Sequence, residues 1–351
     1  MNKVQKIPAR YVALLIQYLE EQGTDCSQAL AQAGIARERL RHIDAQLPSD
    51  QIILATRLLT EASHGQRDLG MRIGAKVGPG QLGELGLAML ACATVKDSLD
   101  LCARYHLLVT PAFSMRTRMV GSLYEVCWQP IQPVPYDVMV LAYDLMLMSC
   151  HTWAQNLLRD DMPSYDAYFF SAAPADLSRY GALKGVRCHF GQGGLPALRI
   201  LMDAEVLSRT FMPMADANHL AEIERRLDMK LLHHLQQTQR DWKAWITMML
   251  TEAQGHQPTL DELAKIVNLS ASTLARYLAA QGASFRDLAQ EIQHERACQW
   301  LREGHLQVRD VASLLGYTNP ANFIRAFKAR AGMSPARYAK AQAGEPSGPR
   351  P

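Results

Sequence analysis

The last third of the chain carries hydrophobic residues at every third or fourth position. Two such stripes lie at 220–231 and 242–249. This spacing gathers apolar side chains on one face of an α-helix. A glycine and a proline, Gly255 and Pro258, then end the pattern. We therefore expect two amphipathic helices followed by a break in the chain.

The preceding part of the chain mixes helical and strand periodicities. Helical spacing runs through 11–22, 26–33, 50–63, 87–93, 95–108, 136–159 and 203–210. Alternating residues predict a hairpin at 113–128 with its turn at Gly121 and Ser122, and short strands at 165–170 and 186–190. The pattern predicts an α+β first domain that is rich in helix and has a small sheet.

An internal repeat occupies 259–340, with an offset of about 50 residues. In each copy an alanine is followed four positions later by a residue that tolerates positive φ. Asn268 follows Ala264 in this way, and Gly316 follows Ala312. The small alanine lets a second helix approach closely, and the left-handed residue turns the chain sharply. Each copy is thus predicted to form a helix-turn-helix unit.

The second helix of each copy has its own start signal. Ser270 can cap the first, and Asn319 can cap the second, with Pro320 at its first helical position. Residues at i and i+4 supply a buried pair, Leu274 with Leu278 and Phe323 with Phe327. Arg276 and Arg325 each follow the first buried residue by two positions, so both are expected to point outward. Residues 285–302 predict one helix that joins the two units.

This region resembles the DNA-binding domain of the AraC/XylS family of transcription regulators over residues 258–339. The resemblance is carried mainly by the second copy, in 310–317, 323–328 and 332–338. It implies an all-α C-terminal domain with two helix-turn-helix units joined by a helix. Two such helices can enter successive major grooves of double-stranded DNA, about 34 Å apart.

The resemblance also implies which side chains face the DNA. The base-facing positions are Ser272, Thr273, Ala275 and Arg276 in the first reading helix and Pro320, Ala321, Asn322 and Arg325 in the second. The side chains placed for phosphate contacts are Ser270, Asn319, Lys328, Arg330 and Arg337. Ser272, Pro320 and Ala321 are shorter than is usual in the family, and Ala339 replaces the usual arginine after Tyr338. We therefore expect few direct base contacts, with the two arginines contributing most.

Residues 60–215 resemble the arabinose-binding-like effector domain of one branch of this family, which includes ornithine-utilisation regulators. The resemblance rests on a glycine series at 80, 83 and 86, on the run 94–105, and on 213–216. It implies a small-molecule sensor, while nothing in the sequence names the effector. Tyr105, Tyr124, Trp128 and Tyr143 are candidates for the pocket wall. The alternative is that these four are ordinary core aromatics.

Composition and charge add less to this interpretation. The formal net charge is +3, and the excess is concentrated in 255–340, where 11 Lys and Arg face 7 Asp and Glu. Seven scattered cysteines and an N-terminus without a signal-peptide pattern favour a cytoplasmic location. The triplet Gly78, Gly80 and Gly83 matches a dinucleotide fingerprint, but turn chemistry explains it better. We expect no metal and no cofactor.

These observations divide the chain into four regions. They are a sensor domain at 1–215, linker helices that can also form a dimer interface at 216–256, the double helix-turn-helix domain at 257–340, and a disordered tail at 341–351. The expected function is effector-controlled, sequence-specific transcription regulation, with activation through RNA polymerase and a homodimer as further expectations.

Two alternatives stay open at this point. One is a bifunctional DNA-binding protein with an enzymatic first domain, for which Cys92 and Cys102 lack an obvious activating partner in the sequence. The other is an adaptor that binds DNA without sequence preference. The expected regulator is not an enzyme.

Overall fold

The chain folds into two compact units in a computed structural model. The first comprises Met1–Gln192 and Ala197–Asp241, and the second comprises Gly193–Pro196 and Trp242–Pro351. The structure describes residues 6–40, 45–63, 66, 68–159, 162–212, 214–237, 240–317 and 319–342. Most of the predicted tail, from 343 onward, lies outside these residues, whereas its first two residues end the last helix.

The first unit is rich in helix. Its described α-helices are α1 (Arg10–Glu21), α2 (Ser27–Gln32), α3 (Ser49–Ala62), α4 (Leu69–Gly74), α5 (Glu84–Ala91), α6 (Val95–Tyr105), α7 (Tyr136–Leu158), α8 (Ala204–Arg209) and α9 (Ala217–Gln237). Shorter 3-10 helices are η1 (Arg37–Leu40), η2 (Pro79–Leu82), η3 (His106–Leu108) and η5 (Ser178–Ala182). Together with the sheets described next, they confirm the predicted α+β class.

In the described part of the chain, two sheets complete this unit. A two-stranded antiparallel sheet pairs β1 (Lys6–Pro8) with β2 (Gln46–Pro48). The larger sheet has five strands in the order β3-β4-β7-β5-β6. Its strands are β3 (Phe113–Val120), β4 (Leu123–Pro130), β5 (Tyr165–Phe169), β6 (Val186–His189) and β7 (Leu198–Asp203). All neighbours are antiparallel except β5 and β6, which are parallel.

The sequence pattern predicted the β3–β4 hairpin but missed the central strand. Val120 pairs with Leu123 across the predicted turn. In β7, Ile200 pairs with Val126 on one side and with Ala167 on the other. The consecutive residues Ile200, Leu201 and Met202 are all buried, so β7 lacks the alternation that marks a half-exposed strand.

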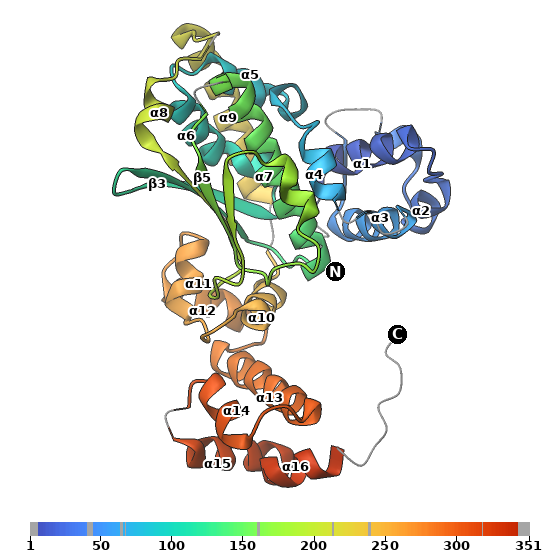
Figure 1. Ribbon diagram of the computed structural model, residues 1–351, viewed down its shortest axis with the longest axis vertical. Helices are drawn as coiled ribbons and strands as arrows, with labels where there is room; N and C mark the ends of the chain where they lie inside the picture. The colour runs from blue at the N-terminus through green and yellow to red at the C-terminus, as the bar shows by residue number, and fades with distance from the viewer. Residues whose placement is uncertain are drawn as a thin grey trace. The chain divides into compact units, whose positions relative to one another are not determined.

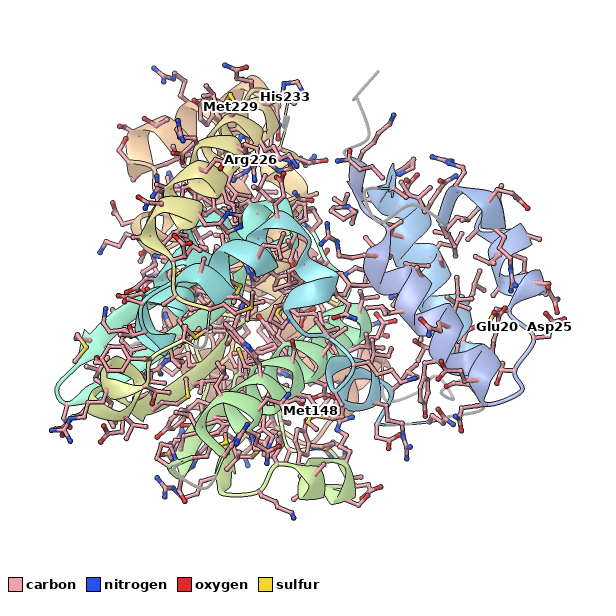
Figure 2. The ribbon with its side chains drawn as sticks, turned by 90° about the horizontal axis from the view of Figure 1, so that it is seen from above. Glu20, Asp25, Met148, Arg226, Met229 and His233 are labelled. Carbon is pink, nitrogen blue, oxygen red and sulfur yellow. The ribbon has the colours of Figure 1, made fainter. Side chains whose placement is uncertain are left out.

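Helices α4 and α7 approach each other closely because α4 presents glycines to its neighbour. A Cβ on Gly70 would lie 2.6 Å from the carbonyl oxygen of Leu141. A Cβ on Gly74 would lie 2.5 Å from the carbonyl oxygen of Leu145 and 2.9 Å from the Cβ of Met148, which Figure 2 labels. Backbone atoms cannot move aside as a flexible side chain can, so this contact requires glycine.

We expect Gly74→Ala to lower the free energy of unfolding by about 1–3 kcal/mol, because the added methyl group overpacks the α4–α7 contact. The better helix propensity of alanine, worth about 0.5–1 kcal/mol, is too small to compensate. Urea unfolding followed by circular dichroism measures the change. Gly80→Ala is the matched control, since a Cβ there meets no heavy atom within 4 Å. Equal stability of the two variants would contradict the tight contact.

Apart from one isolated β-bridge between Gly194 and Gln254, the regular secondary structure of the second unit is helical within the described residues. It contains α10 (Trp242–Glu252), α11 (Leu260–Ile266), α12 (Ala271–Ala280), α13 (Phe285–Glu303), α14 (Val308–Leu314), α15 (Pro320–Ala331) and α16 (Pro335–Gln342). Helix α13 joins the pairs α11–α12 and α14–α15 (Figure 1). The predicted turns are confirmed, because Asn268 has φ 54° and Gly316 has φ 81°. The all-α class of this domain is confirmed as well.

The two predicted helices of the 216–256 segment belong to different units. In α9, Ile223 and Leu227 are buried, and the helix packs against α5 of the first unit. Arg104 of α6 adds ion pairs to Glu224 at 3.0 Å and to Asp228 at 2.9 Å. Helix α10 instead packs against α12 and α13 of the second unit. The stripe on α9 thus has an intramolecular partner, and the division falls between Asp241 and Trp242.

Candidate functional site

The first candidate reading helix, α12, begins at a side-chain cap. The hydroxyl oxygen of Ser270 accepts a hydrogen bond from the backbone N–H of Thr273 at 3.2 Å, as predicted. Leu274 and Leu278 are fully buried. Because residues two positions from a buried one lie on the opposite side of a helix, Arg276 is exposed. Its guanidinium lies 5.8 Å from the ring centroid of Tyr277.

The second candidate, α15, repeats this construction. The side-chain oxygen of Asn319 accepts from the backbone N–H of Ala321 at 2.8 Å, and Pro320 occupies the first helical position. Phe323 and Phe327 are each 2% exposed. Arg325 is exposed and donates a hydrogen bond to Asn322 Oδ1 at 2.5 Å. Both caps, both buried pairs and both outward arginines therefore follow the sequence-based prediction.

Most of the other residues predicted to face DNA are exposed. Ser272, Ala275, Ala321, Asn322, Lys328, Arg330 and Arg337 are exposed, as are the cap residues Ser270 and Asn319, whereas Thr273 and Pro320 are half-buried. Within the described residues, neither Arg276 nor Arg325 pairs with a carboxylate. Their charges are therefore available to an external anion or acceptor. Their contacts with DNA stay a prediction.

Helix α10 supports this surface from inside the second unit. The indole of Trp242 stacks on Tyr277 with ring centroids 5.7 Å apart and an interplanar angle of 11°. One guanidinium nitrogen of Arg296 on α13 donates to the carbonyls of Leu250, Thr251 and Ala253 at 2.7–2.8 Å. These carbonyls lie at and just beyond the end of α10, so Arg296 ties α10 to α13. Nothing in the sequence pattern pointed to this role.

The first unit contains a cavity of about 190 Å³. Its wall combines side chains from β1, α1, α3, α6, β3, β4 and α7 with the segments between them. Aliphatic, aromatic and sulfur-containing side chains dominate the wall, and among the described residues no Lys, Arg, Asp or Glu lines it. His106 and Trp128 both lie on this wall.

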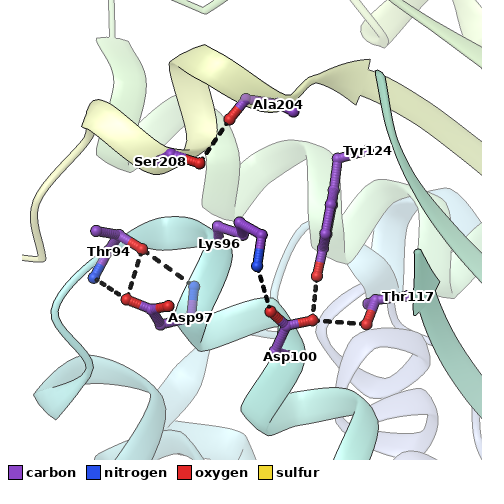
Figure 3. A network of polar contacts seen from close by, with 8 residues as sticks. All are labelled: Thr94, Lys96, Asp97, Asp100, Thr117, Tyr124, Ala204 and Ser208. Carbon is purple, nitrogen blue, oxygen red and sulfur yellow. Dashed lines mark hydrogen bonds and ion pairs between the residues drawn. The ribbon is translucent and has the colours of Figure 1, made fainter. Parts of the chain in front are cut away.

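Only one of the four predicted pocket aromatics lines this cavity. It is Trp128, whereas Tyr105, Tyr124 and Tyr143 are buried elsewhere. The hydroxyl of Tyr105 donates to Asp228 at 2.7 Å. The hydroxyl of Tyr124 donates to Asp100, which also accepts from Lys96 and Thr117 (Figure 3). Tyr143 packs edge-on against Phe113, with ring centroids 5.7 Å apart. In the structure these three tyrosines are core aromatics, which was the alternative interpretation of the sequence.

Sequence reasoning missed His106 as a cavity residue. It follows Tyr105 at the end of a helical stripe and carries no local signal of its own. Burial lowers the pKa of His106 to about 3, because a cationic imidazole would lose its hydration without gaining a counter-charge. The side chain is therefore neutral near pH 7.

The two cysteines weighed for an enzymatic first domain are buried. Cys92 is 1% and Cys102 is 8% exposed. Burial raises the pKa of Cys92 to about 12 and raises the pKa of Cys102 as well. A reactive cysteine needs an accessible thiolate, so this environment disfavours a nucleophilic role for either residue.

Comparison with known proteins decides the family. Residues 23–211 match the family described as the arabinose-binding domain of AraC transcription regulator, N-terminal, and residues 263–341 match a helix-turn-helix domain. The chain belongs to the AraC family of transcription regulators. The predicted resemblance, with its arabinose-binding-like branch, is thereby confirmed, and so is the interpretation as a ligand-responsive DNA-binding regulator.

Individual proteins also resemble most of the chain. The ornithine utilization regulator of Pseudomonas aeruginosa is 25% identical over 340 residues, which cover 95% of this chain and 96% of that protein. An uncharacterized HTH-type transcriptional regulator of Mycobacterium tuberculosis is also 25% identical, over 342 residues. Among solved structures, the regulator CdpR from Pseudomonas aeruginosa covers 90% of this chain and 96% of its own, at 19% identity and a TM-score of 0.42.

The Pseudomonas and Mycobacterium relatives are named as regulators. None of the helices in the described part of the chain is both long and apolar enough to cross a membrane.

Proposed function

We propose that this regulator recognises its operator through Arg276 of α12 and Arg325 of α15. The observation that carries the proposal is the repeated construction of two capped helices, each with a buried i, i+4 pair and an exposed arginine two positions after its first member. A guanidinium can donate two hydrogen bonds to O6 and N7 of a guanine in the major groove.

Neighbouring side chains would position these helices on the DNA. The other exposed polar residues of the two helices, Ser272 and Asn322, lie beside the arginines and can add base contacts. The basic residues Lys328, Arg330 and Arg337 can pair with phosphates, together with those backbone amides at the start of each helix that the cap side chains do not occupy. These contacts set the orientation, whereas the arginines supply sequence preference.

Several further features belong to the same proposal. The cavity of the first unit would bind a small-molecule effector, and its occupancy would change the affinity for DNA. We propose a homodimer that acts as an activator through RNA polymerase, in the cytoplasm. Since Ile223 and Leu227 are already packed within their own chain, the dimer would use another surface than the predicted stripe on α9.

Footprinting at physiological salt tests the proposal, on fragments first selected by their binding to the protein. We expect each chain to protect about two helical turns on one face of the duplex, and a dimer to protect two such sites. An adaptor without sequence preference would instead protect unrelated fragments equally. That outcome would overturn specific recognition while leaving DNA binding intact.

A further inference from the structure

The cavity of the first unit contains two buried polar side chains that lack a partner. In the described part of the chain, the two ring nitrogens of His106 have no hydrogen-bond partner, and the indole N–H of Trp128 has none either. His106 is 6% exposed and Trp128 is 2% exposed. An unsatisfied buried polar group costs about 1–3 kcal/mol. Two such groups on one cavity wall therefore indicate a ligand that supplies the missing partners.

Other polar groups on the same wall already have partners. The hydroxyls of Tyr11 and Thr110 are 3.3 Å apart and hydrogen-bonded to each other. The amide nitrogen of Gln132 donates to the carbonyl of Pro111 at 3.0 Å. The hydroxyl of Ser149 donates to the carbonyl of Val77 at 3.0 Å. Among the buried polar side-chain atoms of this wall, the hydrogen-bonding capacity left for a ligand thus lies at His106 and Trp128.

The charge of the wall restricts the ligand further. Within the described residues no Lys, Arg, Asp or Glu lines the cavity, and the imidazole of His106 is neutral. An ionised carboxylate or ammonium group would therefore be buried without a counter-charge. A sugar, with a hydroxyl group on nearly every carbon, would leave most of its hydroxyls unsatisfied. A volume of about 190 Å³, below the about 300–1,000 Å³ of drug-sized sites, favours a small molecule.

We propose that the effector is a small, uncharged and mainly apolar molecule whose carbonyl or hydroxyl oxygen hydrogen-bonds with Trp128 and His106. This inference rests on the proposed function, in which the first unit binds the effector. The Trp128 indole can only donate, so it requires an acceptor on the ligand. The neutral imidazole offers one donor and one acceptor, so it accommodates either oxygen type.

The test uses the full-length protein and two nearly isosteric probes in isothermal calorimetry. Acetophenone carries a carbonyl oxygen where α-methylstyrene carries a methylene group. We expect acetophenone to bind about threefold to tenfold more tightly, as one net hydrogen bond allows. Benzoate at pH 8, L-arabinose and L-ornithine should give no measurable binding at the same concentrations.

Trp128→Phe keeps an aromatic ring and removes the indole N–H. We expect it to lower the affinity for acetophenone towards that for α-methylstyrene and to leave the hydrocarbon little affected. Trp153→Phe is the matched control, because Trp153 lines the same cavity, is only half-buried, and its indole N–H is not among the buried groups that lack a partner. This control should retain the preference for the ketone. The comparison of the two probes in the unmodified protein remains decisive even if a variant does not fold.

Three results would overturn the inference. They are equal affinities for the ketone and the hydrocarbon, no binding of either, and binding of benzoate, arabinose or ornithine in competition with acetophenone. DNA binding is measured separately on a selected fragment. If that binding is sequence-specific while the probes fail, the effector class alone is wrong. If sequence-specific DNA binding is itself lacking in the unmodified protein, the proposed function is wrong.

Discussion

Replacing Arg276 and Arg325 together by alanine should lower the affinity for the operator by about 2–6 kcal/mol, or roughly 30-fold to 10⁴-fold. A bidentate arginine–guanine contact contributes about 1–3 kcal/mol to discrimination. The two side chains lie on different helices, α12 and α15, so their effects should nearly add. Both are exposed, so the free energy of unfolding should change little. Titration of the protein with labelled operator and with unrelated DNA at fixed salt measures the loss of affinity for each.

Lys328→Ala is the matched control for this prediction. Lys328 is exposed on α15 and is expected to contact phosphate. Its loss should weaken binding to every sequence to a similar degree and reduce the slope of log affinity against log salt by about 1. If the double arginine variant behaved in this uniform way as well, the arginines would be phosphate contacts and the assignment of base recognition would be wrong.

Phe327→Ala should lower the free energy of unfolding of the second unit by about 3–5 kcal/mol. Phe327 is 2% exposed, and its ring centroid lies 5.7 Å from that of Phe323, 5.5 Å from that of Tyr338 and 5.0 Å from that of His294. Truncation removes these contacts and leaves a cavity beneath α15. Urea unfolding followed by circular dichroism measures the loss.

Ile324→Ala supplies the comparison on the same helix. Ile324 is 38% exposed, so its truncation should change the free energy of unfolding by less than about 1 kcal/mol. Binding of acetophenone to the first unit should survive Phe327→Ala, because the effector cavity has its own core in the first unit. A cost for Phe327 no larger than that for Ile324 would contradict the role of this aromatic cluster.

The local sequence pattern was sufficient to predict the two helix-turn-helix units. Each helix-turn-helix unit is specified within about 25 residues by a small alanine, a left-handed residue, a cap and an apolar pair. These signals act between neighbours in the sequence, so they are visible without coordinates. The same holds for the β3–β4 hairpin, whose turn at Gly121 and Ser122 and alternating strands are local features.

In the first unit, long-range packing determines features that the local sequence pattern does not reveal. Strand β7 is buried between β4 and β5, and this burial removes the polar alternation by which a strand is recognised. The aromatic candidates Tyr105, Tyr124 and Tyr143 have the composition of a pocket wall. Their contacts are set by partners more than 20 residues away, such as Asp228 and Asp100, and no periodicity reveals these.

The sequence by itself determined the helix-turn-helix units of this regulator, including the capped helices and the outward arginines, because short-range sterics and hydrogen bonds specify them. Only the tertiary structure decided the chemistry of the first unit. The cavity combines residues from Ile7 to Trp153. Burial among these distant segments makes His106 neutral and leaves the indole N–H of Trp128 without a partner among the described residues. Burial of this kind depends on three-dimensional packing, which the order of residues does not display.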